Sequence, residues 1–106
     1  MSDLNIKTDK NGTELTITLG GRLDTNTSPE LEEIVESSFD GMEKVYFDMA
    51  DLAYISSAGL RVLLTALQIM EDQTGDASNL ILRNVGVEIM DVFEITGFID
   101  DLTIEE

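Results

Sequence analysis

The chain has 106 residues, of which 42% are apolar and 26% charged, and its net charge at pH 7 is −16. This length and composition predict one globular domain, and the negative charge argues against DNA or RNA as a partner, since phosphate binding relies on basic patches. Histidine and cysteine are absent, which removes the usual general base, thiol nucleophile and zinc ligands, so we expect no enzymatic activity, cofactor or metal.

The amino-terminal segment has no features of a targeting signal. Residues 1–5 lack the basic and apolar regions of a signal peptide. The longest mostly apolar stretch, residues 62–70, is too short to cross a bilayer. Together with the absence of cysteine, these observations predict a cytoplasmic protein without membrane insertion.

Alternating apolar residues predict a hairpin at the start of the chain. Leu4 and Ile6 alternate with polar neighbours, and the same pattern returns in residues 15–19 after Asn11-Gly12, a frequent hairpin turn. The following Gly20-Gly21 pair predicts a break or bulge in the second strand.

The segment after Asp24 carries the signals of a helix start. Thr27 or Ser28 can cap the helix, Pro29 fits its first turn, and the acidic residues 30, 32 and 33 favour the positive end of the helix dipole. The apolar residues that follow fall on one helical face: Leu31, Ile34, Val35 and Phe39.

Strands and helices then alternate to the end of the chain. Residues 44–49 form a short and nearly continuous apolar run suited to a central strand, and residues 79–84 are another candidate for a buried strand. A helix between them carries one apolar stripe: Leu60, Leu63, Leu64, Leu67 and Met70. A third helix, marked by Val87, Met90 and Phe93, closes at Gly97, and residues 99–104 can supply an edge strand. This order predicts one α/β domain over residues 1–106, with a mixed, mostly parallel sheet and helices packed against it.

Two adjacent serines mark the candidate site. Ser56 and Ser57 occupy the turn where a predicted strand leads into a helix. A hydroxyl there can cap free backbone N–H groups, and the same N–H groups and the helix dipole favour an added anion such as phosphate. The spacing alone is compatible with either role.

Three stretches resemble the STAS family, the domain shared by sulphate transporters and anti-sigma factor antagonists. Residues 54–64 (YISSAGLRVLL) resemble the family signature. Residues 21–24 (GRLD) resemble its G-x-[IL]-D after the second strand, and residues 92–98 (VFEITGF) resemble the end of its third helix. The three stretches occur in the family's order and span most of the chain, so the resemblance implies a STAS-like fold.

The resemblance also implies a function, that of an anti-sigma factor antagonist regulating sigma-dependent transcription in bacteria. In such antagonists the phosphorylated serine stands two positions before a glycine, which is Ser57 here. Ser56, which replaces a usual aspartate, is the second choice. The implied mechanism is a partner switch, in which the unmodified domain binds an anti-sigma factor that is also a serine kinase, phosphorylation weakens the complex, and a phosphatase restores it. The implied partner-binding residues are Asp24, Thr25, Ser56, Ser57, Ala58, Gly59 and Arg61.

Several alternatives stay open at this point. Asp24 and the loop after it can serve turn and cap chemistry instead, and Arg61 can simply lie in solvent. Within the family, the domain could be a subunit of a transport or stress-sensing assembly, with Ser57 as a helix cap only. No phosphate-binding loop supports the nucleotide binding proposed for some relatives. A response-regulator receiver would need an acidic pair and a late lysine that this chain lacks, and a small acidic hydrolase has only charge in its favour.

Overall fold

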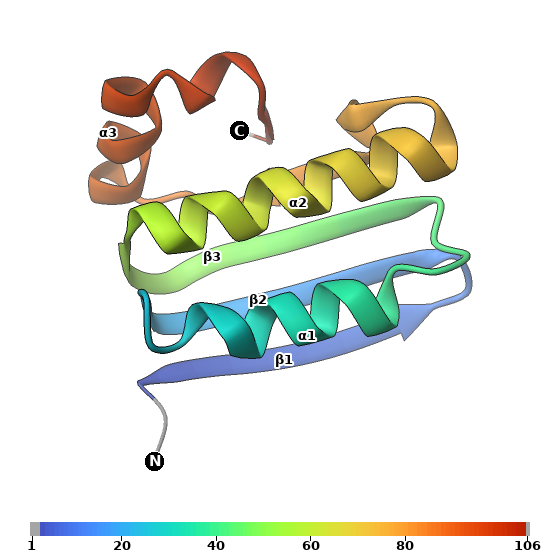
Figure 1. Cartoon of the computed structure of the whole chain (residues 1–106), viewed down its shortest axis with the longest axis horizontal. Helices are drawn as coiled ribbons and strands as arrows, with labels where there is room; N and C mark the ends of the chain where they lie inside the picture. Colours follow the sequence, from blue (N-terminus) through green and yellow to red (C-terminus); the bar gives the residue numbers. More distant parts are fainter. Residues whose placement is uncertain (1–2, 106) are drawn as a thin grey trace.

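A five-stranded sheet organises residues 3–105, the part of the chain that the computed structural model describes (Figure 1). The strands are β1 (Leu4–Asn11), β2 (Glu14–Leu23), β3 (Lys44–Ile55), β4 (Leu80–Arg83) and β5 (Thr103–Ile104). The α-helices are α1 (Ser28–Ser38), α2 (Ser57–Thr74) and α3 (Val87–Thr96), and two short 3₁₀ turns are η1 (Ala77–Asn79) and η2 (Phe98–Asp100). The predicted single α/β domain with a mixed, mostly parallel sheet is confirmed.

The amino-terminal hairpin forms as predicted. β1 pairs antiparallel over its whole length with residues 14–21 of β2, around a turn in which Gly12 has a φ of +64°. The ladder between β2 and β3 then shifts register twice, between Thr18 and Gly20 and again after Gly21. At Gly21, φ is +90° and a β-carbon would lie 2.1 Å from the carbonyl oxygen of Asp3, so the bulge requires glycine there.

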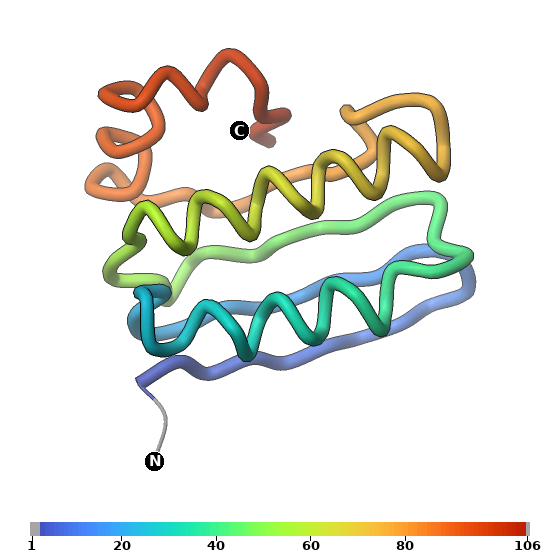
Figure 2. The backbone as a smooth tube through the Cα atoms, in the orientation of Figure 1, coloured from blue at the N-terminus to red at the C-terminus, as the bar shows by residue number. Residues whose placement is uncertain are grey.

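The order of the strands places all three helices on one face of the sheet. The spatial order is β1-β2-β3-β4-β5, and the three pairs from β2 to β5 are parallel. Each helix connects two neighbouring parallel strands. Such connections are almost always right-handed, and the sheet grows in one direction, so every crossover falls on the same side. Figure 1 shows α1 and α2 in front of the strands, and Figure 2 traces the same path as a continuous tube.

The core lies between this covered face and the helices. Alternate residues of β2 and β3 are fully buried, as expected for strands with one face in the core. They pack in a single cluster with side chains from all three helices: Leu31 and Val35, Leu60, Leu63 and Leu67, and Phe93. The predicted third helix ends at Gly97, whose φ is +80°.

Residues 44–49 lie in β3, the middle strand of the sheet, as the apolar run predicts, and two other local predictions differ in detail from the structure. The run 44–49 is buried on one face only, because Tyr46 and Asp48 point away from the helices and are half-buried. Leu64 leaves the apolar stripe of α2 and is 37% exposed. The predicted edge strand within residues 99–104 forms but is short: residues 99 and 100 belong to η2, and only β5, Thr103–Ile104, is strand. In addition, β3 extends to Ile55. In its second half the buried residues, Met49, Leu52 and Ile55, are three positions apart, because the β2–β3 ladder shifts register there.

Residues 3–105 contain neither a candidate membrane span nor a candidate metal site. No helix within residues 3–105 has the length and hydropathy that a membrane span requires. Within the same residues, no group of three histidine, cysteine, aspartate or glutamate side chains is placed to hold a metal ion.

Candidate functional site

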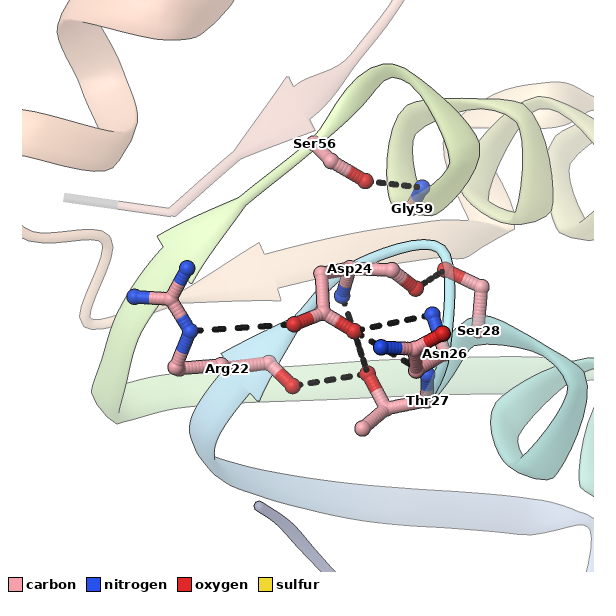
Figure 3. Close-up of polar contacts among 7 residues, drawn as sticks. All are labelled: Arg22, Asp24, Asn26, Thr27, Ser28, Ser56 and Gly59. Atoms are coloured by element: carbon pink, nitrogen blue, oxygen red, sulfur yellow. Dashed lines mark hydrogen bonds and ion pairs between the residues drawn. The ribbon is translucent and has the colours of Figure 1, made fainter.

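The ends of β2 and β3 bring two loops together. Leu23 and Ile55 are the last partners of this ladder, and the backbone N–H of Ser56 donates to the carbonyl oxygen of Leu23 at 2.9 Å. Because carboxyl ends of neighbouring parallel strands lie at the same edge of a sheet, the loop that begins at Asp24 lies beside the start of α2 (Figure 3).

The two serines have different environments. Ser56 is the N-cap of α2, with extended backbone, and its Oγ accepts a long hydrogen bond of 3.4 Å from the N–H of Gly59. Ser57 is the first residue of the helix and is exposed. Its hydroxyl has no hydrogen-bond partner within residues 3–105. The cap therefore comes from Ser56, and the hydroxyl of Ser57 is available to another molecule.

Gly59 allows α2 to start close to the strand ends. A β-carbon at this position would lie 2.8 Å from Cγ of Leu23 and 2.9 Å from Cγ1 of Ile55. Both of those side chains are buried, so they have little room to move aside. Glycine thus sets how closely the serine-bearing turn approaches the sheet.

Asp24 holds the neighbouring loop in shape. Its Oδ1 accepts hydrogen bonds from the backbone N–H groups of Asn26 at 3.0 Å and Thr27 at 3.1 Å. The Thr27 hydroxyl in turn accepts from the N–H of Asp24 at 2.9 Å and donates to the carbonyl oxygen of Arg22 at 2.8 Å. The expectation that Thr27 or Ser28 caps α1 was wrong as regards the side chain: Thr27 occupies the N-cap position, but its side chain makes no capping bond.

The surroundings of Asp24 change the pKa of its carboxyl group. Partial burial acts to raise this pKa, but hydrogen bonds from the Thr27 and Asn26 backbones and from the Thr27 hydroxyl outweigh it. The Arg22 guanidinium, whose Nε lies 3.7 Å from Oδ2, adds a smaller effect in the same direction. The net result lowers the pKa of Asp24 below its ordinary value of 3.8, so the side chain is a carboxylate at neutral pH.

A small hollow joins three of the predicted partner-binding residues. Thr25, Ala58 and Arg61 line a hollow of about 190 Å³ between the first turns of α1 and α2. Asp24, Ser56, Ser57 and Gly59 do not line it. A larger hollow, about 520 Å³ and lined in part by Lys44, lies at the other end of β3, far from the serines. Arg61 is exposed, as one of the alternatives above expected.

Two residues beside the site were not singled out from the sequence. The guanidinium carbon of Arg22 lies 4.3 Å from the ring centroid of Tyr54, its partner in the β2–β3 ladder. Arg22 also reaches the carboxylate of Asp24. In the sequence, Arg22 stands two positions before Asp24, and Tyr54 stands two positions before Ser56. This equal spacing was the only sequence feature that could have indicated that Arg22 and Tyr54 lie beside the site.

Comparison with known proteins identifies the family. The STAS domain model matches residues 5–106. The chain is 31% identical over 105 residues to the anti-sigma-B factor antagonist of Staphylococcus epidermidis, covering 98% of this chain and 94% of that protein. It shares its fold with the anti-sigma factor antagonist SpoIIAA in its unphosphorylated form (TM-score 0.74, 15% identity, 96% and 88% of the two chains). It also shares its fold with the Bacillus cell fate determinant SpoIIAA in the phosphorylated form (TM-score 0.72, 18% identity, 96% and 92% of the two chains). The chain therefore belongs to the STAS domain family.

Proposed function

We propose that this domain is an anti-sigma factor antagonist that is switched by phosphorylation of Ser57. Unmodified, it binds an anti-sigma factor that is also a serine kinase, which frees a sigma factor for transcription. Phosphorylation weakens the complex, and a phosphatase restores it. The domain acts in the bacterial cytoplasm as a binding partner, with no catalysis of its own. Support comes from the relative named an anti-sigma-B factor antagonist, which matches nearly the whole chain.

The observation that carries the choice of residue is the contrast between the two serines. Ser57 is exposed and its hydroxyl lacks a partner among the described residues, whereas Ser56 is half-buried and caps the helix. A kinase must reach the hydroxyl that it modifies. Ser57 satisfies that requirement without any loss of helix capping, and Ser56 remains the second choice.

The start of α2 suits an added phosphate. Phosphorylation brings about −1.5 to −2 charges and three acceptor oxygens, and free N–H groups with the helix dipole stabilise such a group at a helix N-terminus. The first turn of α2 contains no acidic residue. Arg61 stands four residues after Ser57 on the same helix, a spacing at which side chains can pair. The phosphate would therefore leave the fold intact and change only the surface.

The loss of binding then follows from charge at the interface. Asp24, Thr25, Ala58 and Arg61 surround the serine turn and form the proposed contact surface with Ser56, Ser57 and Gly59. Burying a doubly charged phosphate in that surface costs desolvation energy unless the partner supplies matching cations. A partner selected for a neutral hydroxyl at this point would lose affinity.

The test uses the domain with phosphoserine incorporated at position 57 and the unmodified domain. Both are titrated calorimetrically with the purified anti-sigma factor of the source organism. The expected result is binding of the unmodified form and a loss of affinity of roughly tenfold or more, about 1.4 kcal/mol, for the phosphorylated form. A third form, with phosphoserine at position 56, tests whether the position of the phosphate matters. Equal affinities of the three forms would contradict the switch.

A further inference from the structure

The second face of the sheet has no helix over it. Because all three crossovers fall on the same side, the chain within residues 3–105 leaves nothing to cover the other side. No residue that alternates with the core positions of β2 and β3 is buried; Thr16, Thr18, Tyr46 and Asp48, for example, are all half-exposed. We call this surface the open face. Sheets built from parallel strands usually have both faces covered, and three of the four strand pairs here are parallel.

The open face collects most of the chain's cations. Four of the six lysines and arginines stand on it, at strand positions that alternate with core residues or pair with a residue that does: Lys7, Arg22, Lys44 and Arg83. Five carboxylates share this face: Asp9, Glu14, Asp48, Asp51 and Glu105. Four cations against five carboxylates leave a net charge of −1, whereas the whole chain carries −16. The open face is therefore close to neutral and carries both signs of charge.

The helix layer is very different. The three α-helices together carry nine carboxylates and a single cation, Arg61. Their outer surface would repel the same surface of another copy. The exposed apolar residues of α3, Val87 at 78% and Ile95 at 85%, stand on a helix with three carboxylates. Charge thus disfavours self-association through the helices and permits it through the open face.

Both tyrosines of the chain lie on the open face, each with an arginine stacked on its ring. The guanidinium carbon of Arg83 is 3.8 Å from the ring centroid of Tyr46, and that of Arg22 is 4.3 Å from the centroid of Tyr54. Arg83 also bonds to the carboxylate of Glu105 at 3.1 Å. These contacts hold the long side chains in place, so binding there loses less conformational entropy. Tyrosine and arginine are the residue types that dominate binding energy at interfaces.

We propose that a second copy of this chain packs against the open face, forming a twofold dimer through the two sheets. A twofold axis brings the same patch of both copies together, so each cation can lie opposite a carboxylate of the other copy, and both acidic helix layers point outward. Strands about 4.8 Å apart with a rise of about 3.3 Å per residue give the face roughly 600 Å². Two such faces bury about 1,200 Å², the lower limit for specific interfaces, so the dimer is weak. The proposed dimer does not depend on the phosphorylation switch.

The experiment is sedimentation velocity of the unmodified chain at physiological salt, from about 5 µM to about 500 µM, a range that brackets weak dissociation constants. The expected result is a change from 11.7 kDa toward twice that mass. Amide chemical shifts recorded over the same range should change on β2, β3 and β4 and stay constant on α3. These measurements need no variant and so do not depend on the folding of one.

Two variants locate the interface. Tyr46→Ser removes one arginine–tyrosine stack, and Thr18→Glu adds a carboxylate at a half-exposed position of the open face; each should weaken the dimer by roughly tenfold or more. The matched control is Ile95→Ser, which removes an exposed apolar side chain from α3 and should leave the dimer unchanged. A monomer at every concentration would overturn the proposal. The proposal would also be overturned if Ile95→Ser abolished the dimer while Tyr46→Ser and Thr18→Glu left it intact.

Discussion

The backbone of Ser56 is hydrogen-bonded to the carbonyl oxygen of Leu23 at 2.9 Å. Through this bond the end of β2 fixes the turn that carries both serines, and the loop that Asp24 shapes starts at the next residue. The position of Ser57 thus depends on the junction of two strands rather than on a flexible loop. The first predictions concern this junction.

Replacing Gly59 by alanine should destabilise the domain. The added β-carbon would approach Leu23 and Ile55 to within 2.9 Å, and overpacking of this kind costs about 1–3 kcal/mol. Urea unfolding followed by circular dichroism measures the loss. Gly86→Ala is the control, because its β-carbon would meet no atom within 4 Å and its φ is −71°. If both variants lose the same stability, the close approach at Gly59 is not what requires glycine.

The two serines should respond differently to alanine. Ser56→Ala removes the oxygen that caps Gly59, which costs about 0.5–1 kcal/mol because the bond is long. Ser57→Ala removes no hydrogen bond seen in residues 3–105 and should stay within about 0.5 kcal/mol of the wild type. Thermal unfolding of both variants checks this difference. A larger loss for Ser57→Ala would mean that Ser57 serves the helix rather than a partner.

Charge at position 57 should weaken the complex without affecting the fold. Ser57→Asp places a negative charge where the phosphate would stand, so its affinity for the anti-sigma factor should fall, while Ser57→Ala should bind whether or not the kinase is active. Calorimetric titration gives the affinities, and circular dichroism verifies folding. Unchanged binding by a folded Ser57→Asp protein argues against Ser57 as the centre of the contact surface.

Arg61 should interact with a phosphate on Ser57. The spacing of four residues and the helix N-terminus both favour the dianion, so the second pKa of the phosphoserine should lie below its ordinary value of about 6. ³¹P NMR titration of the phosphorylated domain measures this pKa. Arg61→Gln should raise it, whereas Lys10→Gln, on the distant β1 hairpin, should not. Equal titration curves for all three proteins would show that Arg61 has no contact with the phosphate.

Acid should destabilise the domain in part through Asp24. Its folded pKa is lowered below 3.8, so the unfolded chain binds the proton more readily and stability rises with pH in this window. The contribution is complete above pH 3.8 and is lost as pH falls through the folded pKa. Denaturant midpoints measured from neutral pH to below pH 3.8 should fall less steeply for Asp24→Asn than for the wild type. Parallel curves for the two proteins would contradict this role.

Local patterns in the sequence predicted most of the fold. The hairpin around Gly12, the bulge at Gly21 and the end of α3 at Gly97 follow from turn chemistry and alternation, which act over a few residues. The features that these patterns did not predict involve distant partners. The run 44–49 predicts a central strand but not that Tyr46 and Asp48 lie on an uncovered face, because the single-sided placement of the helices follows from the order of all five strands and from no local pattern.

The sequence could predict which residues form the candidate site, but not the role of each residue or the contacts between them. The family resemblance selected the serine turn and the Asp24 loop, but no spacing distinguishes Ser56 from Ser57 as the cap, since both precede the helix. The stack of Arg22 on Tyr54 depends on register between strands that lie about thirty residues apart in the chain. That register follows from the bulge, whose size the sequence does not specify.

The partner switch is tested most directly by mass spectrometry of this protein isolated from its native cells, with fragmentation between Ser56 and Ser57. The account predicts one phosphate, located on Ser57, in a fraction of molecules that changes with growth conditions. Phosphate on Ser56 alone would contradict the assignment of the residue. Absence of phosphate under every condition would contradict the switch itself and would favour a role in a transport or stress-sensing assembly.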